Sequence, residues 1–99
     1  MQTVLTDRLL TVFLSGEIDH HTAGRIREKT DSEIIRNQPK EILLDFSDVS
    51  FMDSSGVGLV IGRYKLAKSY GIKLSVSGLS QRDKKILMMS GLQNLIEFR

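Results

Sequence analysis

The chain has no cysteine and no tryptophan, and it has a single proline in 99 residues. Without cysteine there is no disulfide framework, no thiolate metal site and no cysteine nucleophile. Long hydrophobic runs are missing too, because no stretch approaches the ~20 apolar residues that a membrane crossing needs. The N-terminus also lacks the basic and apolar segments of a secretion signal. We therefore expect a cytoplasmic protein that does not bind a membrane.

An excess of charge of one sign is also lacking, since 14 basic and 12 acidic residues give a formal net charge of +2. Nucleic-acid binding needs a clustered basic face. The densest basic stretch, Arg82 with Lys84 and Lys85, is interrupted by Asp83, which is typical of a solvated helix face. We expect no nucleic-acid partner. The length and the 40% apolar content predict one domain over residues 1–99, and nothing indicates an obligate dimer, so we expect a monomer.

Short apolar runs and alternating patterns predict strands at residues 2–6, 9–15, 41–46, 72–77 and 95–98. Apolar residues spaced by three and four predict three helices, which begin near Asp19, at Ser54 and at Ser80. Asp19 and Ser80 are predicted N-caps. A loop is predicted from Ser47 to Asp53. This order of elements predicts an α/β fold, a mixed sheet of four to five strands with helices packed against it.

Two hydroxyls and two glycines stand where this loop meets the second helix, in the segment FMDSSGVG at residues 51–58. The first N–H groups of a helix have no partner within it and favour anions, so a phosphate on Ser54 would be tolerated. Local chemistry offers another explanation, in which Asp53 or Ser54 caps the helix while Gly56 and Gly58 allow close packing. Glycine in a helix costs up to ~1 kcal/mol relative to alanine, which indicates a surface that something approaches closely. On local grounds alone, capping is the better supported of the two interpretations.

The stretch FMDSSGVGLVIGRYK strongly resembles the signature of the anti-sigma factor antagonists, the anti-anti-sigma branch of the STAS domain family. The resemblance extends to SGEIDHHTA at residues 15–23 and to MSGL at residues 89–92, so it covers nearly the whole chain. The sporulation sigma-F type is the most similar. The resemblance implies a mixed sheet with three to four helices on one side.

The resemblance also implies a function without catalysis by this chain. The serine at position 54 would be phosphorylated by an anti-sigma factor that is also a serine kinase, and Ser55 matches the second, non-acceptor serine. Unphosphorylated antagonist would bind the kinase and release the sigma factor, phosphorylation would break that complex, and a PP2C-type phosphatase would reverse it. ATP and divalent metal then belong to the partners, and this chain needs no cofactor.

The predicted partner-binding residues surround that serine in the sequence or match acidic and docking positions of the family. They are Asp19, Asp53, Ser54, Ser55, Gly56, Val57, Gly58 and Arg63. Asp19 has two compatible roles, as N-cap and as a residue near the phosphorylated serine. Val57 is either part of the docking surface or part of the core.

Other functional classes fit less well. Ser54, His20 and Asp19 supply the residue types of a hydrolase triad, but Met52 stands where a nucleophile elbow requires glycine. The two adjacent histidines lack further ligands at a metal-site spacing. Gly62 follows one residue too late for a dinucleotide fingerprint. The remaining alternatives are a STAS scaffold, a nucleotide- or ligand-sensing module, and an antagonist of the general stress response.

Overall fold

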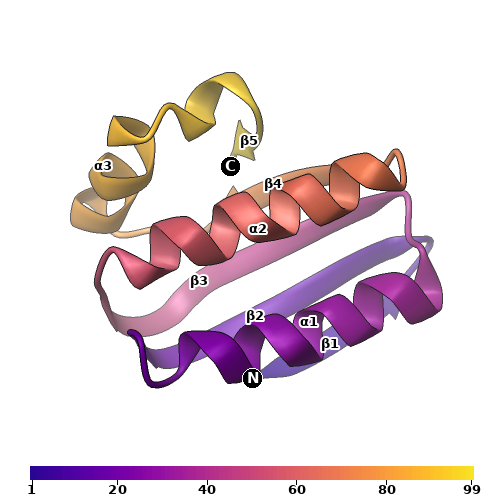
Figure 1. Cartoon of the computed structure of the whole chain (residues 1–99), viewed down its shortest axis with the longest axis horizontal. Coiled ribbons are helices and arrows are strands. Elements are labelled where there is room, and N and C mark those ends of the chain that lie inside the picture. Colours follow the sequence, from indigo (N-terminus) through magenta and orange to yellow (C-terminus); the bar gives the residue numbers. More distant parts are fainter.

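Five strands form one mixed sheet in the order β1-β2-β3-β4-β5 in the computed structural model, which describes residues 1–99 (Figure 1). The strands are β1 (Gln2–Thr6), β2 (Leu9–Ile18), β3 (Glu41–Met52), β4 (Lys73–Ser77) and β5 (Glu97–Phe98). The helices are α1 (Ala23–Asn37), α2 (Ser55–Ser69), α3 (Gln81–Met89) and the short 3-10 helix η1 (Leu92–Asn94). β1 runs antiparallel to β2, and the other neighbours are parallel. The predicted mixed α/β sheet is confirmed.

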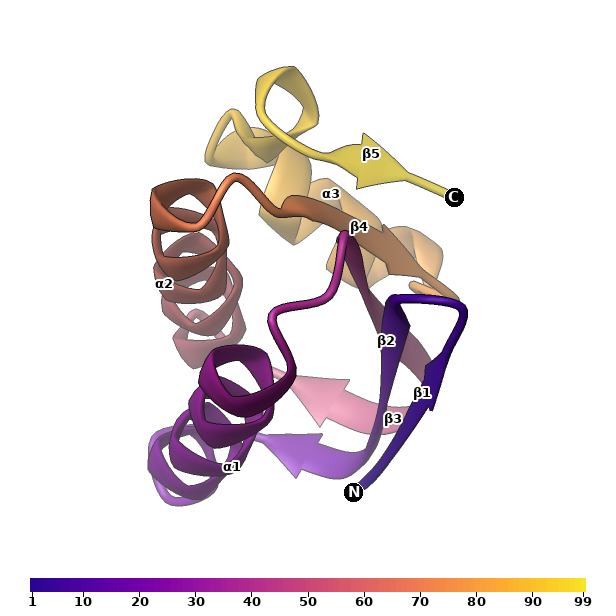
Figure 2. The same ribbon diagram turned by 90° about the vertical axis from the view of Figure 1, so that its right-hand side faces the viewer.

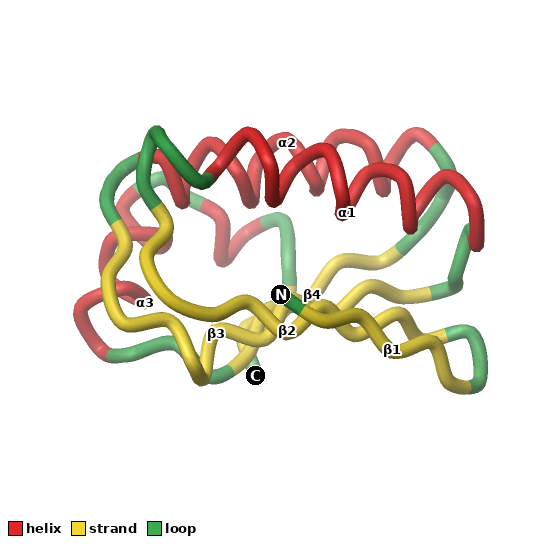
Figure 3. The backbone as a smooth tube through the Cα atoms, turned by 90° about the horizontal axis from the view of Figure 1, so that it is seen from below, coloured by secondary structure: helices red, strands yellow, loops and turns green.

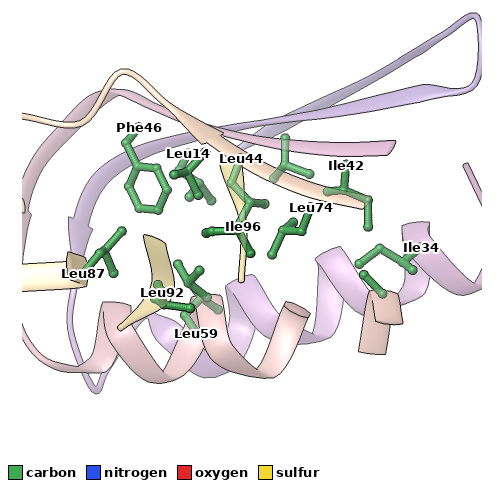
Figure 4. Close-up of a cluster of buried hydrophobic side chains, with 14 of the residues drawn as sticks. Leu14, Ile34, Ile42, Leu44, Phe46, Leu59, Leu74, Leu87, Leu92 and Ile96 are labelled. Carbon is green, nitrogen blue, oxygen red and sulfur yellow. The ribbon is translucent and has the colours of Figure 1, made fainter. Parts of the chain in front are cut away.

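Helices α1 and α2 lie side by side across one face of the sheet (Figures 2 and 3). Alternate residues of the central strands point toward them, because side chains of a strand alternate between its two faces. Leu92 and Leu87, from η1 and α3, join the same cluster of buried side chains as Leu44 of β3 and Leu59 of α2 (Figure 4). Burying each such side chain contributes roughly 1.5–3 kcal/mol. The helices therefore pack on one side of the sheet, as the resemblance implied.

The predicted loop over residues 47–53 is wrong, because β3 continues to Met52. Residues 48–52 pair with residues 15–18 of β2, which itself runs past its predicted end at residue 15. Two register shifts accompany this pairing. The segment has no strong strand pattern of its own, and the hydrogen bonds of the neighbouring strand keep it extended. Both strands consequently end at the same edge of the sheet, beside the start of α2.

Several element ends differ from the predictions by a few residues. The first helix begins at Ala23, four residues after the predicted cap. The closing strand is limited to residues 97–98, since residues 92–94 form η1. The start of α3 is confirmed, because the Ser80 hydroxyl accepts a hydrogen bond from the Asp83 N–H at 3.0 Å. Gly71, just after α2, has φ +71°, the left-handed conformation expected of glycine at that position.

Candidate functional site

The turn between β3 and α2 holds Ser54 at the edge of the sheet. The N–H of Asp53 donates to the carbonyl of Ile18 at 3.1 Å, which ties the turn to the end of β2. The Asp53 carboxylate accepts the Ser55 N–H at 2.7 Å. Ser54 occupies the N-cap position, but its side chain is exposed and makes no capping hydrogen bond. Asp53 therefore binds the free N–H at the start of α2, and the Ser54 hydroxyl remains available.

The two glycines after Ser54 have different surroundings. A Cβ added to Gly56 would overlap the side chain of Met52, so its predicted packing role is confirmed. A Cβ on Gly58 or on Gly62 would have nothing within 4 Å, so the close packing that the capping interpretation gives Gly58 is absent, and no other element packs closely against Gly62. Val57 is half-buried and packs against the core while keeping some exposed surface. Gly58 is thus an exposed piece of bare helix backbone one turn from Ser54.

Asp19 fixes the turn that leads from β2 into α1. Its Oδ1 atom accepts the N–H groups of His21 at 2.8 Å and Thr22 at 3.1 Å. The helix N-cap is Thr22, so the predicted capping of α1 by Asp19 is wrong, and the carboxylate stabilises the preceding turn instead. Desolvation raises the pKa of Asp19, but these hydrogen bonds outweigh it and hold the pKa below its usual value. The turn that holds Asp19 adjoins the turn that holds Asp53, because the Asp53 N–H is hydrogen-bonded to the carbonyl of Ile18. Two acidic residues therefore lie around Ser54.

Arg63 does not form an open docking surface. Only 5% of the residue is exposed, so this predicted partner-binding residue offers little surface to a partner. Its Nε lies 2.7 Å from Oδ1 of Asp31, and its Nη2 donates to Oδ2 of the same carboxylate at 3.3 Å. Burial lowers the pKa of Arg63 and the neighbouring Arg27 adds to this effect, while Asp31 opposes it. The pair joins α2 to α1.

A shallow groove of about 350 Å³ runs between the first halves of α1 and α2. Small residues and two arginines line it: Ala23, Gly24, Arg27, Ser55, Gly58, Leu59, Gly62 and Arg63. The groove is not predicted from the sequence, although glycines in both helices are the signal for it. Gly62 faces this groove, which explains why no other element packs against it.

Arg82, at the start of α3, is a further residue at the site that the sequence analysis had placed on a solvated helix face. Its Nη1 donates to the carbonyl of Met52 at 3.0 Å and contacts the Asp83 carboxylate at 3.1 Å. Its guanidinium also lies over the ring of Phe51, 5.6 Å from the centroid. No local pattern links positions 30 residues apart. Arg82 holds α3 against the strand end that leads to Ser54.

The rings of the adjacent His20 and His21 contact each other at a tilt of 40°, with centroids 3.9 Å apart. No group of three or more histidine, cysteine, aspartate or glutamate side chains lies together in a position to hold a metal ion. None of the helices has the length and apolar character that spanning a bilayer demands.

Antagonists of two anti-sigma factors, F and B, are similar in sequence to this chain. The family model for the STAS domain matches residues 1–99. The anti-sigma F factor antagonist of Paenibacillus polymyxa is 43% identical over 84 residues, which cover 85% of this chain and 72% of that protein. The anti-sigma-B factor antagonist of Bacillus subtilis (strain 168) is 33% identical over 88 residues, which cover 89% of this chain and 79% of that protein.

Solved structures of SpoIIAA, an anti-sigma factor antagonist, have the same fold. The unphosphorylated form matches with a TM-score of 0.84 at 32% identity, over 99% of this chain and 86% of that one. The phosphorylated form of the Bacillus protein matches with a TM-score of 0.77 at 32% identity, over 99% of this chain and 89% of that one. The chain therefore belongs to the STAS domain family and, within it, to the group of the anti-sigma factor antagonists.

Proposed function

We propose that this chain is a cytoplasmic anti-anti-sigma factor that is controlled by phosphorylation of Ser54. Unphosphorylated, it binds an anti-sigma factor that is also a serine kinase, and the sigma factor is released. Phosphorylation by that kinase ends the complex, and a PP2C-type phosphatase restores the active form. The kinase and the phosphatase supply the ATP and metal sites. The observation that carries the proposal is the exposed Ser54 hydroxyl, free of any capping bond because Asp53 takes that role.

A phosphate at this position supplies the switch by its charge. It adds about −1.5 to −2 charges next to Asp53, in a turn tied to the one that holds Asp19. Docking of another protein would have to desolvate this charge, and a buried unpaired charge costs about 3–5 kcal/mol. The positive end of the α2 dipole tolerates the negative charge of the phosphate within the free chain. Phosphorylation thus opposes the complex without opposing the fold.

The names of the relatives support this function and favour one pathway. Relatives named as antagonists of anti-sigma F and of anti-sigma-B factors both match, and the former reach the higher identity, 43% against 33%. We therefore propose a sporulation sigma factor as the one released, in preference to a sigma factor of the general stress response.

The test is to incubate the chain with ATP, Mg²⁺ and the anti-sigma factor kinase of the same organism, and to locate phosphate by mass spectrometry. We expect one phosphate, on Ser54, and none on the Ser54→Ala variant. Calorimetry should show that Ser54→Ala binds the kinase like the wild type, while Ser54→Asp loses about 2–5 kcal/mol of binding free energy. Phosphate on Ser55, or equal binding by all three proteins, would overturn the proposal.

The groove between α1 and α2 favours a second candidate, a ligand-sensing module. The exposed Arg27 supplies positive charge there, and glycines expose the backbone. Titration of the chain with ATP and GTP, followed by amide chemical shifts of the groove residues, separates the candidates. Saturable shifts at Gly24, Gly58 and Gly62 would support sensing, and their absence leaves the antagonist function as the sole proposal.

A further inference from the structure

The outward face of α3 combines apolar and basic side chains without covering any part of the core. Its residues Gln81, Lys84, Lys85, Met88 and Met89 surround a surface hollow of about 530 Å³. Met89 is 80% exposed, more than any other large hydrophobic residue of the chain. The five residues around the hollow recur every three or four positions, so most of them lie along one side of α3. Leu87 and Asp83 point the other way and are buried. We call these five residues the α3 face.

The α3 face carries positive charge that no residue of this chain neutralises. Neither Lys84 nor Lys85 takes part in any of the ion pairs of the structure. The acidic residue of the helix, Asp83, is 6% exposed and contacts Arg82. An exposed methionine flanked by free lysines is suited to a partner surface with apolar side chains and carboxylates, because methionine adapts to irregular partners and charge complementarity guides association.

The α3 face is connected to the proposed docking surface around Ser54. Arg82 lies one residue from the face, donates to the carbonyl of Met52 and covers the ring of Phe51, which is itself 45% exposed. The start of α2 and helix α3 lie at the same end of the molecule (Figure 1). A partner that contacts Ser54 thus meets Phe51 and Arg82 before it reaches the α3 face.

We propose that the α3 face is a second docking surface for the anti-sigma factor kinase, and that it binds an acidic amphipathic helix of that partner. This inference rests on the function proposed above. The α3 face is a row of side chains spaced by three or four residues, at positions 81, 84, 85 and 88. A helix of the partner suits this row, because docked helices present their anchor residues at the same spacing. An anionic membrane is the less suitable occupant, since recognition of lipid headgroups typically takes clusters of about four to eight basic residues, and this face offers only Lys84 and Lys85.

The test uses the whole chain and two variants, Lys84→Glu with Lys85→Glu, and Met89→Ser. Both change exposed side chains, so folding is unaffected, as circular dichroism and thermal unfolding should confirm. Calorimetry with the purified kinase should show each variant binding about tenfold more weakly than the wild type. The effect of the lysine variant should shrink at high salt, because exposed charges are screened. The matched control is Lys40→Glu with Lys65→Glu, which makes the same charge change away from the α3 face and should bind like the wild type.

Failure of this inference is distinguishable from failure of the proposed function. If Ser54→Asp abolishes binding while both α3 variants bind like the wild type, the second surface is wrong and the antagonist function stands. If the wild type does not bind the kinase, both are wrong. Sedimentation with vesicles of phosphatidylserine and phosphatidylcholine completes the test, because binding of the wild type but not of the lysine variant would identify lipid as the occupant and overturn the inference.

Discussion

Gly56 and Gly58 show how two identical residues in one helical turn serve different purposes. Gly56 is in contact with the fully buried Met52, and Gly58 is open to solvent. The first lets α2 approach the end of β3, which places Ser54 at the sheet edge. The second leaves bare backbone at the proposed docking surface.

We predict that Gly56→Ala lowers the free energy of unfolding by about 1–3 kcal/mol, because the added methyl group overlaps the side chain of Met52, which is fully buried and has to shift within the core. The control is Gly58→Ala, which should leave stability unchanged or raise it by up to ~1 kcal/mol through helix propensity. Urea denaturation of both variants checks the prediction. Equal changes at the two positions would contradict the different packing described for them.

Asp19 predicts a pH dependence of stability. Its folded-state pKa is held low by backbone hydrogen bonds, so its contribution is fully present above the unfolded-state pKa of about 3.9 and is lost as the pH falls through the folded-state value. Wild type and Asp19→Asn should therefore differ in the free energy of unfolding at pH 7 and converge in acid. Denaturation at a series of pH values measures this. A difference that stays constant with pH would show that the carboxylate charge is not the stabilising feature.

At the scale of elements, the pair of Arg63 and Asp31 joins the two helices that cover the sheet. Removing one partner of a fully buried ion pair costs about 3–5 kcal/mol. Asp31 has 28% of its side chain exposed, so we predict a smaller loss, about 1–3 kcal/mol, for Asp31→Ala. The double variant Asp31→Leu with Arg63→Met should recover most of it, because no unpaired guanidinium remains buried. Chemical denaturation of the wild type, the single variant and the double variant checks both predictions.

The elements also show where sequence-based prediction succeeds. Helix α2 and the cap of α3 were predicted because apolar spacing and capping residues act within one or two turns. The second half of β3 was missed, because residues 48–52 are held extended by the end of β2 and not by their own pattern. Arg63 was misplaced for a related reason. An arginine normally belongs on the solvent side, and only its partner on another helix makes burial tolerable.

At the scale of the whole molecule, one fold serves both states of the proposed switch. SpoIIAA retains the fold of this chain in its unphosphorylated and its phosphorylated form. In the proposed switch, the charge of the phosphate would act on the partner's approach and not on the packing of the core.

We accordingly predict that Ser54→Asp leaves the free energy of unfolding unchanged or raises it by up to ~1 kcal/mol, since the position is exposed and lies at a helix start. Thermal and urea unfolding measure the stability, and amide chemical shifts should change only near the β3–α2 turn. A loss of several kcal/mol would mean that the variant fails to bind through unfolding, and binding data on it would then not report on the switch.

The sequence alone determined the class of fold and the family, and it carries the prediction for Ser54, because these depend on local periodicity and on an unbroken motif. The tertiary structure decided what surrounds that serine. It assigned capping to Asp53, removed Arg63 from the surface, brought Arg82 to the carbonyl before the turn and left the α3 face uncovered. These outcomes depend on contacts between residues far apart in the chain, and no local pattern carries that information.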